Sequence, residues 1–366
     1  MKISRKTICD LVESKVREDP AYAAAMKKDN RWLQVNVAVM DTEAIIEKLR
    51  SFGVPFGRAQ FEKDLRGMES ADRLSTQWAR LPTCTAKETD DDFLFLAAME
   101  LRKRLLPDLI TPEALDDWMQ EGYRLSKEGK PIEAARVWLK VWRAIQSRMT
   151  GTGHTTAEAD DLVRGTQCVF NWCQDFQIEL CNAGLKDPAF FRECAEYCRA
   201  FVETFSGEGD LLPGFRRYEV EARFAMGERE QAEGMFESLI REDRSDAWNY
   251  ILWADQYWLK GGAQAHRDFA RAEAIYLRAL EEPRLDDTTA VHERLAEMYR
   301  EWGKPDLAER HEMLAEEGAE DKDPGEPVFS ITRGGGGEEE GLKVNRNAPC
   351  TCGSGKKFKK CCGRSR

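Results

Sequence analysis

The apolar residues of this chain recur with the spacing of amphipathic helices. Residues 191–205 show this clearly, because their apolar positions follow an i, i+3, i+4, i+7 pattern. Nearer the N-terminus, a second pattern orders residues as bulky, small, small and bulky, at Trp118, Gly122, Ala134 and Trp138. Gly129 falls between the two halves of this pattern. Small residues let two helices approach and bulky ones fill the space beside them, so the pattern predicts a helical hairpin.

The hairpin pattern returns further along the chain. Gly227 and Gly303 repeat the turn position of Gly129. The alanine of the pattern also recurs, with steps of 61, 37, 40 and 36 residues, at Ala134, Ala195, Ala232, Ala272 and Ala308. Steps of this length are typical of helix pairs that bury their apolar faces by stacking on their neighbours. The pattern resembles tetratricopeptide repeats over residues 111–317, although Glu121 and Val220 replace the leucine and glycine of that family. An irregular helical bundle with accidental periodicity is the alternative.

The predicted fold class is therefore all-α, a tetratricopeptide-like solenoid of helical hairpins preceded by a mainly helical region over residues 1–110. In that region, Thr42–Phe52 predicts a helix that Gly53 ends. Residues 91–106 predict another, which begins with acidic and ends with basic residues, as the helix dipole favours. The acidic residues at its start are interpreted as a helix N-terminus and not as a metal site, at Asp90, Asp91 and Asp92.

One segment of the N-terminal region alternates with a period of two residues. Its apolar positions are Leu33, Val35, Val37 and Val39. This alternation predicts a β-strand, with a buried helix as the alternative, because a single strand would have no partner in a helical chain.

Composition and charge narrow the class of protein. The chain has 366 residues, of which 42% are hydrophobic and 33% charged, with a net charge of −11. No stretch is apolar enough to predict a membrane span, and the charged N-terminus does not resemble a signal peptide, so we expect a cytoplasmic protein. All acidic residues lie within residues 1–340, whereas residues 341–366 carry eight Lys or Arg. This asymmetry predicts a basic contact surface, or a basic tail that folds back on the acidic body.

Residues 318–344 predict a flexible linker, because they contain acidic residues, prolines and a run of four glycines but few apolar side chains. The segment that follows, 345–366, carries four thiols as CxC, eight residues and then CC. It is too short for a hydrophobic core, and a tetrahedral Zn²⁺ with four thiolates would supply the missing folding energy. The predicted zinc ligands are Cys350, Cys352, Cys361 and Cys362. A disulfide pair is not expected, because it would need an oxidising compartment. A catalytic zinc is not expected either, because four thiolates leave no free coordination position. A redox-sensing zinc centre is the remaining alternative.

Residues 349–362 closely resemble the SEC-C motif, a zinc-binding module at the C-terminus of the preprotein translocase ATPase SecA. The shared pattern is Pro-Cys-x-Cys-Gly-Ser-Gly-Lys-Lys, an aromatic residue, lysine and a closing Cys-Cys. The resemblance implies the same four zinc ligands and a contact role, since in SecA the module contacts the chaperone SecB and the ribosome. It covers about 20 residues and implies no translocation activity, because the chain has no GxxxxGK[ST] phosphate loop.

Other cysteines and histidines are weaker candidates. A second cysteine group shares the apolar faces of predicted helices, at Cys168, Cys173, Cys181, Cys194 and Cys198. We interpret these residues as buried thiols, with a second metal site as the alternative. The four histidines fall singly along the sequence, near helix ends or on polar faces, at His154, His266, His292 and His311. His292 is expected in a groove or at the surface.

Three functions follow from these features. The first is a zinc-binding adaptor, whose repeats hold a protein and whose tethered finger contacts a chaperone, the ribosome or another protein. The second is RNA binding by the finger, in which lysines pair with phosphates and the aromatic residue stacks on a base. In both cases the expected partner-binding residues are Lys356, Lys357, Phe358, Lys359 and Lys360. The third is an enzyme within residues 1–110, which is not expected, because no nucleophile–base pair, phosphate loop or paired-carboxylate arrangement is recognisable there. No small-molecule substrate is evident for the chain.

Overall fold

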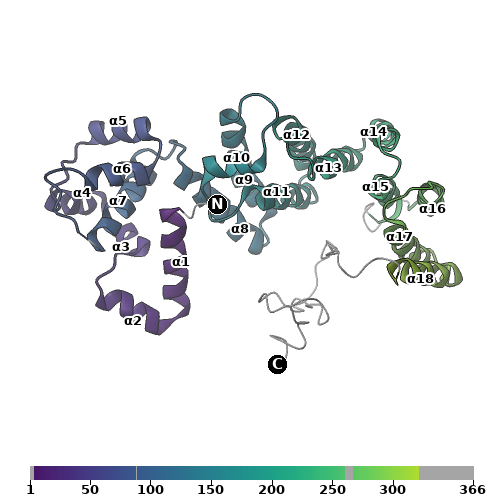
Figure 1. Ribbon diagram of the computed structural model, residues 1–366, viewed down its shortest axis with the longest axis horizontal. Coiled ribbons are helices and arrows are strands. Elements are labelled where there is room, and N and C mark those ends of the chain that lie inside the picture. Colours follow the sequence, from purple (N-terminus) through teal and green to yellow (C-terminus); the bar gives the residue numbers. More distant parts are fainter. Residues whose placement is uncertain (1–3, 88, 260–266, 321–366) are drawn as a thin grey trace. The chain divides into compact units, whose positions relative to one another are not determined.

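The computed structural model describes residues 4–87, 89–259 and 267–320, and over these residues the chain is entirely α-helical (Figure 1). The all-α prediction is confirmed for this part of the chain. Residues 1–319 form one compact unit. The N-terminal helices are α1 (Arg5–Glu18), α2 (Pro20–Lys28), α3 (Gln34–Ala38), α4 (Thr42–Ser51), α5 (Arg58–Met68), α6 (Ala71–Ala79) and α7 (Thr89–Leu105). The remaining helices are α8 (Pro112–Lys127), α9 (Pro131–Arg148), α10 (Thr156–Val163), α11 (Val169–Gly184), α12 (Ala189–Thr204), α13 (Leu212–Ala225), α14 (Arg229–Glu242), α15 (Ala247–Trp258), α16 (Phe269–Leu280), α17 (Thr288–Glu301) and α18 (Pro305–Glu320).

The helix ends follow local rules that the sequence displays. Thr111 caps α8 by accepting a hydrogen bond from the backbone N–H of Ala114, and Pro112 occupies the first helical position. Helix α4 ends just before Gly53, which adopts a φ of +75°. The predicted helix end at Gly53 is confirmed, because a left-handed glycine acts within a single turn of the chain.

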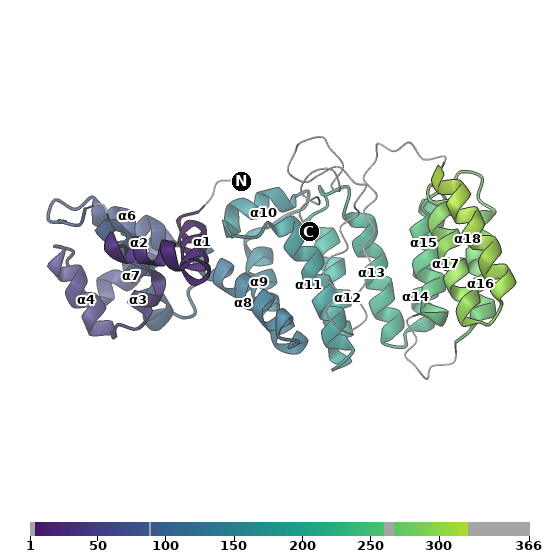
Figure 2. The same cartoon turned by 90° about the horizontal axis from the view of Figure 1, so that it is seen from below.

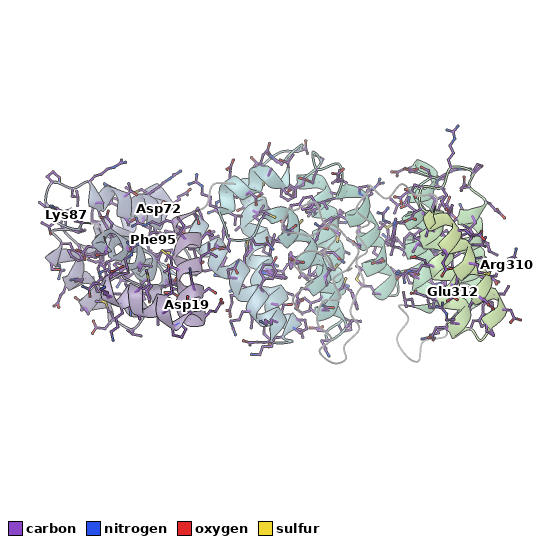
Figure 3. The ribbon with its side chains drawn as sticks, turned by 60° about the horizontal axis from the view of Figure 1, so that its bottom comes forward. Asp19, Asp72, Lys87, Phe95, Arg310 and Glu312 are labelled. Carbon is purple, nitrogen blue, oxygen red and sulfur yellow. The ribbon has the colours of Figure 1, made fainter. Side chains whose placement is uncertain are left out.

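A first hydrophobic core gathers α3 to α7 around α7. The apolar run at the centre of α7 is buried on every side, because α3, α4 and α6 pack against it. The acidic residues of α7 lie in its first turn and the basic ones in its last, as the sequence predicts. Helix α1 adds a polar contact, since the guanidinium of Arg5 lies 5.1 Å from the ring of Phe95 and 3.9 Å from the carboxylate of Asp72, both labelled in Figure 3.

The strand predicted over Leu33–Val39 is wrong, because this segment forms the short helix α3. The alternative of a buried helix is right about the helix but not about its burial, since Val37 is the one buried residue of α3. The helical turn buries Val37 and leaves Val35 and Val39 at 55% and 80% exposure. The side chain of Asn36 accepts a hydrogen bond from the backbone N–H of Leu33 and so closes the first turn. An alternating pattern of valines therefore does not make a strand here, since α7 offers an apolar helix face and no neighbouring strand.

Two further cores follow along the chain from α8 to α18. Neighbouring helices lie side by side in chain order, and α8 packs on α9, α11 on α12, and α15 on α16 (Figure 2). Gly129, Gly227 and Gly303 stand in the turns after α8, α13 and α17 with φ between +70° and +82°. These left-handed turns match the recurring glycine positions of the sequence. Helix α10 accounts for the long step of 61 residues, because it stands as an additional helix between α9 and α11.

Candidate functional site

The residues expected to carry the chemistry of the finger lie outside the described part of the chain. These are the expected zinc ligands, Cys350, Cys352, Cys361 and Cys362, and the expected contact residues, Lys356, Lys357, Phe358, Lys359 and Lys360. The linker expected over residues 318–344 also lies outside it, apart from the end of α18. The described residues supply four other features that bear on function: a cleft, a thiol cluster, a histidine pair and a buried charge network.

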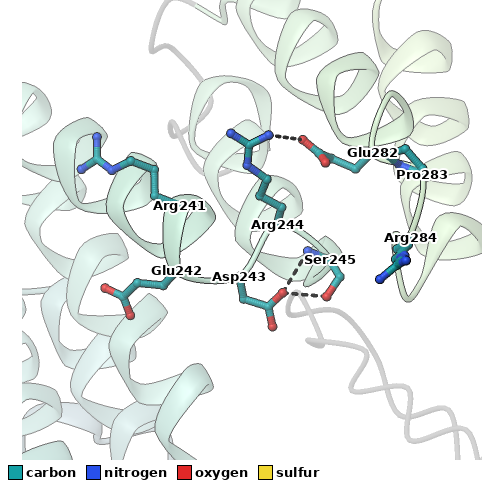
Figure 4. Close-up of a pocket in the computed structure, with 8 residues that line it drawn as sticks. All are labelled: Arg241, Glu242, Asp243, Arg244, Ser245, Glu282, Pro283 and Arg284. Carbon is teal, nitrogen blue, oxygen red and sulfur yellow. Dashed lines mark hydrogen bonds and ion pairs between the residues drawn. The ribbon is translucent and has the colours of Figure 1, made fainter.

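One cleft opens at one end of α14, α15 and α16 and has a volume of about 390 Å³ (Figure 4). The last turn of α14, the connection to α15 and the loop after α16 form its walls. Most of its lining residues are charged: Arg241, Glu242, Asp243, Arg244, Ser245, Glu282, Pro283 and Arg284. No local sequence pattern marks these residues, because the two charged loops are far apart along the chain and meet only through helix packing.

The carboxylates of this cleft are more fully engaged than its guanidinium groups. Arg216, outside the cleft, pairs with Glu242 at 2.6 Å, and Asp243 accepts hydrogen bonds from the backbone and hydroxyl of Ser245. Arg244 reaches Glu282 at only 3.8 Å, beyond direct hydrogen-bond distance. Arg284 forms no ion pair with any described residue. Arg241 donates a hydrogen bond to Ser238, so Arg284 is the guanidinium of this cleft that remains available to an acidic group.

The cysteines of α11 and α12 form a buried cluster. Cys173, Cys194 and Cys198 are fully buried, as predicted, while Cys168 and Cys181 are partly exposed. Burial raises the pKa of Cys173 and Cys198 above that of an ordinary thiol. Within the described residues, no three histidine, cysteine or acidic side chains converge to hold a metal ion. Cys173 and Cys198 are therefore protonated thiols within a helix–helix interface.

Two histidines that fall singly along the sequence meet in the last hairpin. Nδ1 of His292, in α17, lies 2.9 Å from Nδ1 of His311, in α18. Burial lowers the pKa of both imidazoles, and for His311 the charges of His292 and Arg310 lower it further. His292 is half-buried, in keeping with the groove or surface position expected for it. His154 differs, because the carbonyl of Thr150 and the carboxylate of Glu158 raise its pKa.

A buried charge network fastens α1 to α8. Nζ of Lys6 lies 2.9 Å from Asp116, 3.1 Å from Asp117 and 2.6 Å from Asp10. Lys6 and Asp116 are 4% and 1% exposed, so both charges are removed from water. Burial alone would lower the pKa of Lys6, but the three carboxylates together raise it. Lys6 is therefore a structural cation, and its high pKa keeps it from acting as a base.

Comparison with known proteins identifies one segment. The SEC-C motif family matches residues 346–364, a range that contains all four cysteines of the finger. The SecA subunit of the protein translocase from Symbiobacterium thermophilum is 44% identical over 57 residues, which cover 16% of this chain and 5% of that protein. SecA from Finegoldia magna is 55% identical over 46 residues, covering 11% and 5%.

A third relative is not a translocase subunit by name. A UPF0225 protein of Vibrio vulnificus is 86% identical over 22 residues, which cover 6% of this chain and 13% of that protein. The chain thus spans only a small fraction of each of these relatives. No solved structure matches the chain. Among the described helices, none combines the length and the apolar character needed to cross a bilayer.

Proposed function

We propose that this protein is a cytoplasmic, zinc-binding adaptor. Its helical repeats, residues 111–317, would hold one protein partner, and its basic finger, residues 345–366, would contact a second through the linker 318–344. The observation that carries the proposal is the SEC-C match over residues 346–364. Neither part calls for a catalytic step, because the proposed action is to bring two partners together.

The donor set of the finger suits zinc. Four thiolates satisfy the tetrahedral preference of Zn²⁺ and leave no open coordination position, which is the arrangement of a structural site. The bound ion would supply the free energy that closes the short segment, and the neighbouring lysines would offset the net negative charge of the zinc–thiolate centre. The finger would then present a compact basic surface to an acidic partner such as a chaperone or a ribosomal component.

The helical part is proposed to act as a tetratricopeptide-like solenoid. Its support is the recurrence of tight turns at Gly129, Gly227 and Gly303 and the stacking of successive helices. A stacked array of helix pairs offers an extended surface to a peptide or protein. The arginine-bearing cleft at the end of α14–α16 is one place on this surface where an acidic side chain would meet the guanidinium of Arg284.

A second candidate function is RNA binding by the finger. The observation that favours it is the basic tail, since residues 341–366 contain eight Lys or Arg and no acidic residue. In that case Lys356, Lys357, Lys359 and Lys360 would neutralise phosphates and Phe358 would stack on a base. Affinity would then fall steeply with salt, whereas a protein contact that buries apolar surface would weaken less.

The test compares the full chain with two variants in reducing buffer. Cys350→Ser with Cys352→Ser should abolish stoichiometric zinc and the contact made by the finger, while a chain that ends at Val344 should lose the same partners. Cys84→Ser, a substitution of the same type among the helices, is the control and should retain both. Full-length protein without stoichiometric zinc would overturn the proposal, as would a set of bound partners that neither change alters. The partner held by the repeats should remain bound in both variants.

A further inference from the structure

Two thiols lie in contact within the hairpin of α11 and α12. Sγ of Cys181, near the end of α11, is 3.7 Å from Sγ of Cys194, in α12. Cys194 is fully buried, whereas Cys181 is partly exposed at the end of its helix. We propose that this pair is an oxidisable dithiol, which hydrogen peroxide converts into a Cys181–Cys194 disulfide. This site is independent of the zinc finger and of its partners.

A buried amide is directed at both sulfur atoms. Nε2 of Gln177 lies 3.1 Å from Sγ of Cys181 and 3.8 Å from Sγ of Cys194, and Gln177 is only 1% exposed. Packing of apolar side chains does not call for an amide here, because a buried polar group costs free energy unless it forms hydrogen bonds. An N–H donor beside sulfur stabilises the negative charge of a thiolate. Gln177 is therefore a positioning residue, which favours the reactive form of Cys181.

The partial exposure of Cys181 makes it the thiol that the oxidant reaches. Its thiolate attacks one oxygen of hydrogen peroxide, the O–O bond breaks, hydroxide leaves, and a sulfenic acid forms on Cys181. Sγ of Cys194 then attacks the sulfur of that sulfenic acid. The S–S bond forms, the S–O bond breaks, and the thiol proton of Cys194 departs with the hydroxyl group as water. Two thiols are oxidised and one peroxide is reduced, so the electrons balance.

The second thiol stays protonated until it is needed. The hydrogen bond with Cys181 lowers the pKa of Cys194, but contact with Cys198 and burial raise it well above that of an ordinary thiol. Cys194 therefore resists direct oxidation and acts as the resolving thiol once Cys181 has reacted. The product would join α11 to α12 between two residues that lie 13 positions apart in the chain. Such a cross-link restricts the unfolded chain and should raise the temperature of unfolding.

Tryptic mapping of the full, zinc-loaded chain tests the proposal. After exposure to peroxide and blocking of free thiols, cleavage after Arg164, Lys186, Arg192 and Arg199 separates the two cysteines. Residues 165–186 should then appear joined to residues 193–199, lighter by two hydrogens than the sum of the peptides, and a reductant should separate them. Cys181→Ser and Cys194→Ser should each lose this species, while Cys168→Ser and Cys198→Ser should keep it.

Two further readouts separate a positioned dithiol from a packing cluster. Gln177→Leu should slow formation of the cross-linked species by about fivefold, the effect of losing one hydrogen bond of ordinary strength. Unfolding curves of the reduced variants, compared with that of the reduced parent chain, show whether each substitution leaves the hairpin folded. The proposal is overturned if the cross-link survives in a folded Cys181→Ser chain. It is equally overturned if peroxide leaves Cys181 as an isolated oxidised residue while Cys194 remains a free thiol.

Discussion

Gly122 lies directly against the indole of Trp138 across the hairpin of α8 and α9. A β-carbon on Gly122 would stand 2.0 Å from Nε1 of Trp138, far inside any permitted contact. The same nitrogen donates a hydrogen bond of 3.0 Å to the carbonyl oxygen of Met119, so the ring cannot move away without losing that bond. The missing side chain of Gly122 therefore sets the distance between the two helices.

Gly122→Ala should destabilise the protein, because the new methyl group must push the helices apart or displace a buried indole. We expect the free energy of unfolding to fall by about 2 kcal/mol, the usual cost of overpacking a tight core. Urea unfolding followed by circular dichroism measures it. Gly234→Ala is the matched control in α14, where nothing lies within 4 Å of the new β-carbon. In that control, the free energy of unfolding should rise by roughly 0.5–1 kcal/mol, because alanine has a higher helix propensity than glycine. Equal effects at the two positions would contradict this account.

The pairing of His292 with His311 makes the last hairpin sensitive to acid. The two Nδ1 atoms are 2.9 Å apart, so one must accept a hydrogen bond from the other. The accepting imidazole must be neutral, because a protonated imidazole has no acceptor nitrogen. The pKa of both is lowered in the folded state, so the stability they contribute is present above the ordinary histidine pKa of about 6.5 and is lost as pH falls below it. Arg310 and the buried ring of Tyr299, which packs on His311, offer no acid to offset a second proton.

Thermal unfolding at about pH 8 and about pH 5.5 measures this effect. His292→Asn keeps a hydrogen-bonding group but does not titrate, so the midpoint should fall less on acidification than in the parent chain. His154→Asn is a control in which the pH dependence should change in the opposite direction. The folded-state pKa of His154 is raised, so its contribution is present at low pH and is lost as pH rises. Removing it should therefore make the acid-induced fall larger. A His292→Asn chain with the parent pH dependence would rule out a role for the pair.

Local patterns in the sequence predict much of this fold. The helix end at Gly53 and the turn at Gly129 are each determined within one helical turn, and the structure places them as expected. The valines near Val37 show where such reasoning fails. Their alternation describes side-chain polarity alone, whereas the choice between strand and helix depends on which partner the rest of the fold provides.

The sites depend on contacts that no local pattern contains. His292 and His311 are 19 residues apart, and Lys6 and Asp116 are 110 positions apart, so only the packing of whole helices brings them together. The cluster formed by Cys173, Cys194 and Cys198 is different. Its burial follows from the apolar faces of two helices, but the contact of Cys181 with Cys194 depends on the register between those helices. The proposed zinc ligands need no such information, because the spacing of the cysteines alone defines the motif.

Removal of the charge on Lys6 should weaken the attachment of α1. Lys6→Met keeps most of the volume of the side chain but leaves the carboxylate of Asp116 buried. Its remaining donors among the described residues are the backbone N–H and the hydroxyl of Thr166. A buried charge without its partner costs several kcal/mol, and we expect a loss of about 3 kcal/mol in the free energy of unfolding. Lys63→Met, at an exposed position of α5, should change it by less than about 0.5 kcal/mol. Similar losses in both variants would argue against the buried network.

Removal of zinc should unfold the finger and spare the helices. A structural zinc site supplies on the order of 10–16 kcal/mol of binding free energy, and the segment it folds has almost no apolar core of its own. The helices of residues 1–319 form a separate unit with their own buried cores. A chelator should therefore shift the NMR signals of Gly353 and Gly355 and leave the main thermal transition where it was. Cys350→Ser should reproduce the chelated spectrum without chelator, and Cys84→Ser should not. Identical tail spectra with and without chelator would refute the zinc site, and a lowered main transition would show that the metal also supports the helices.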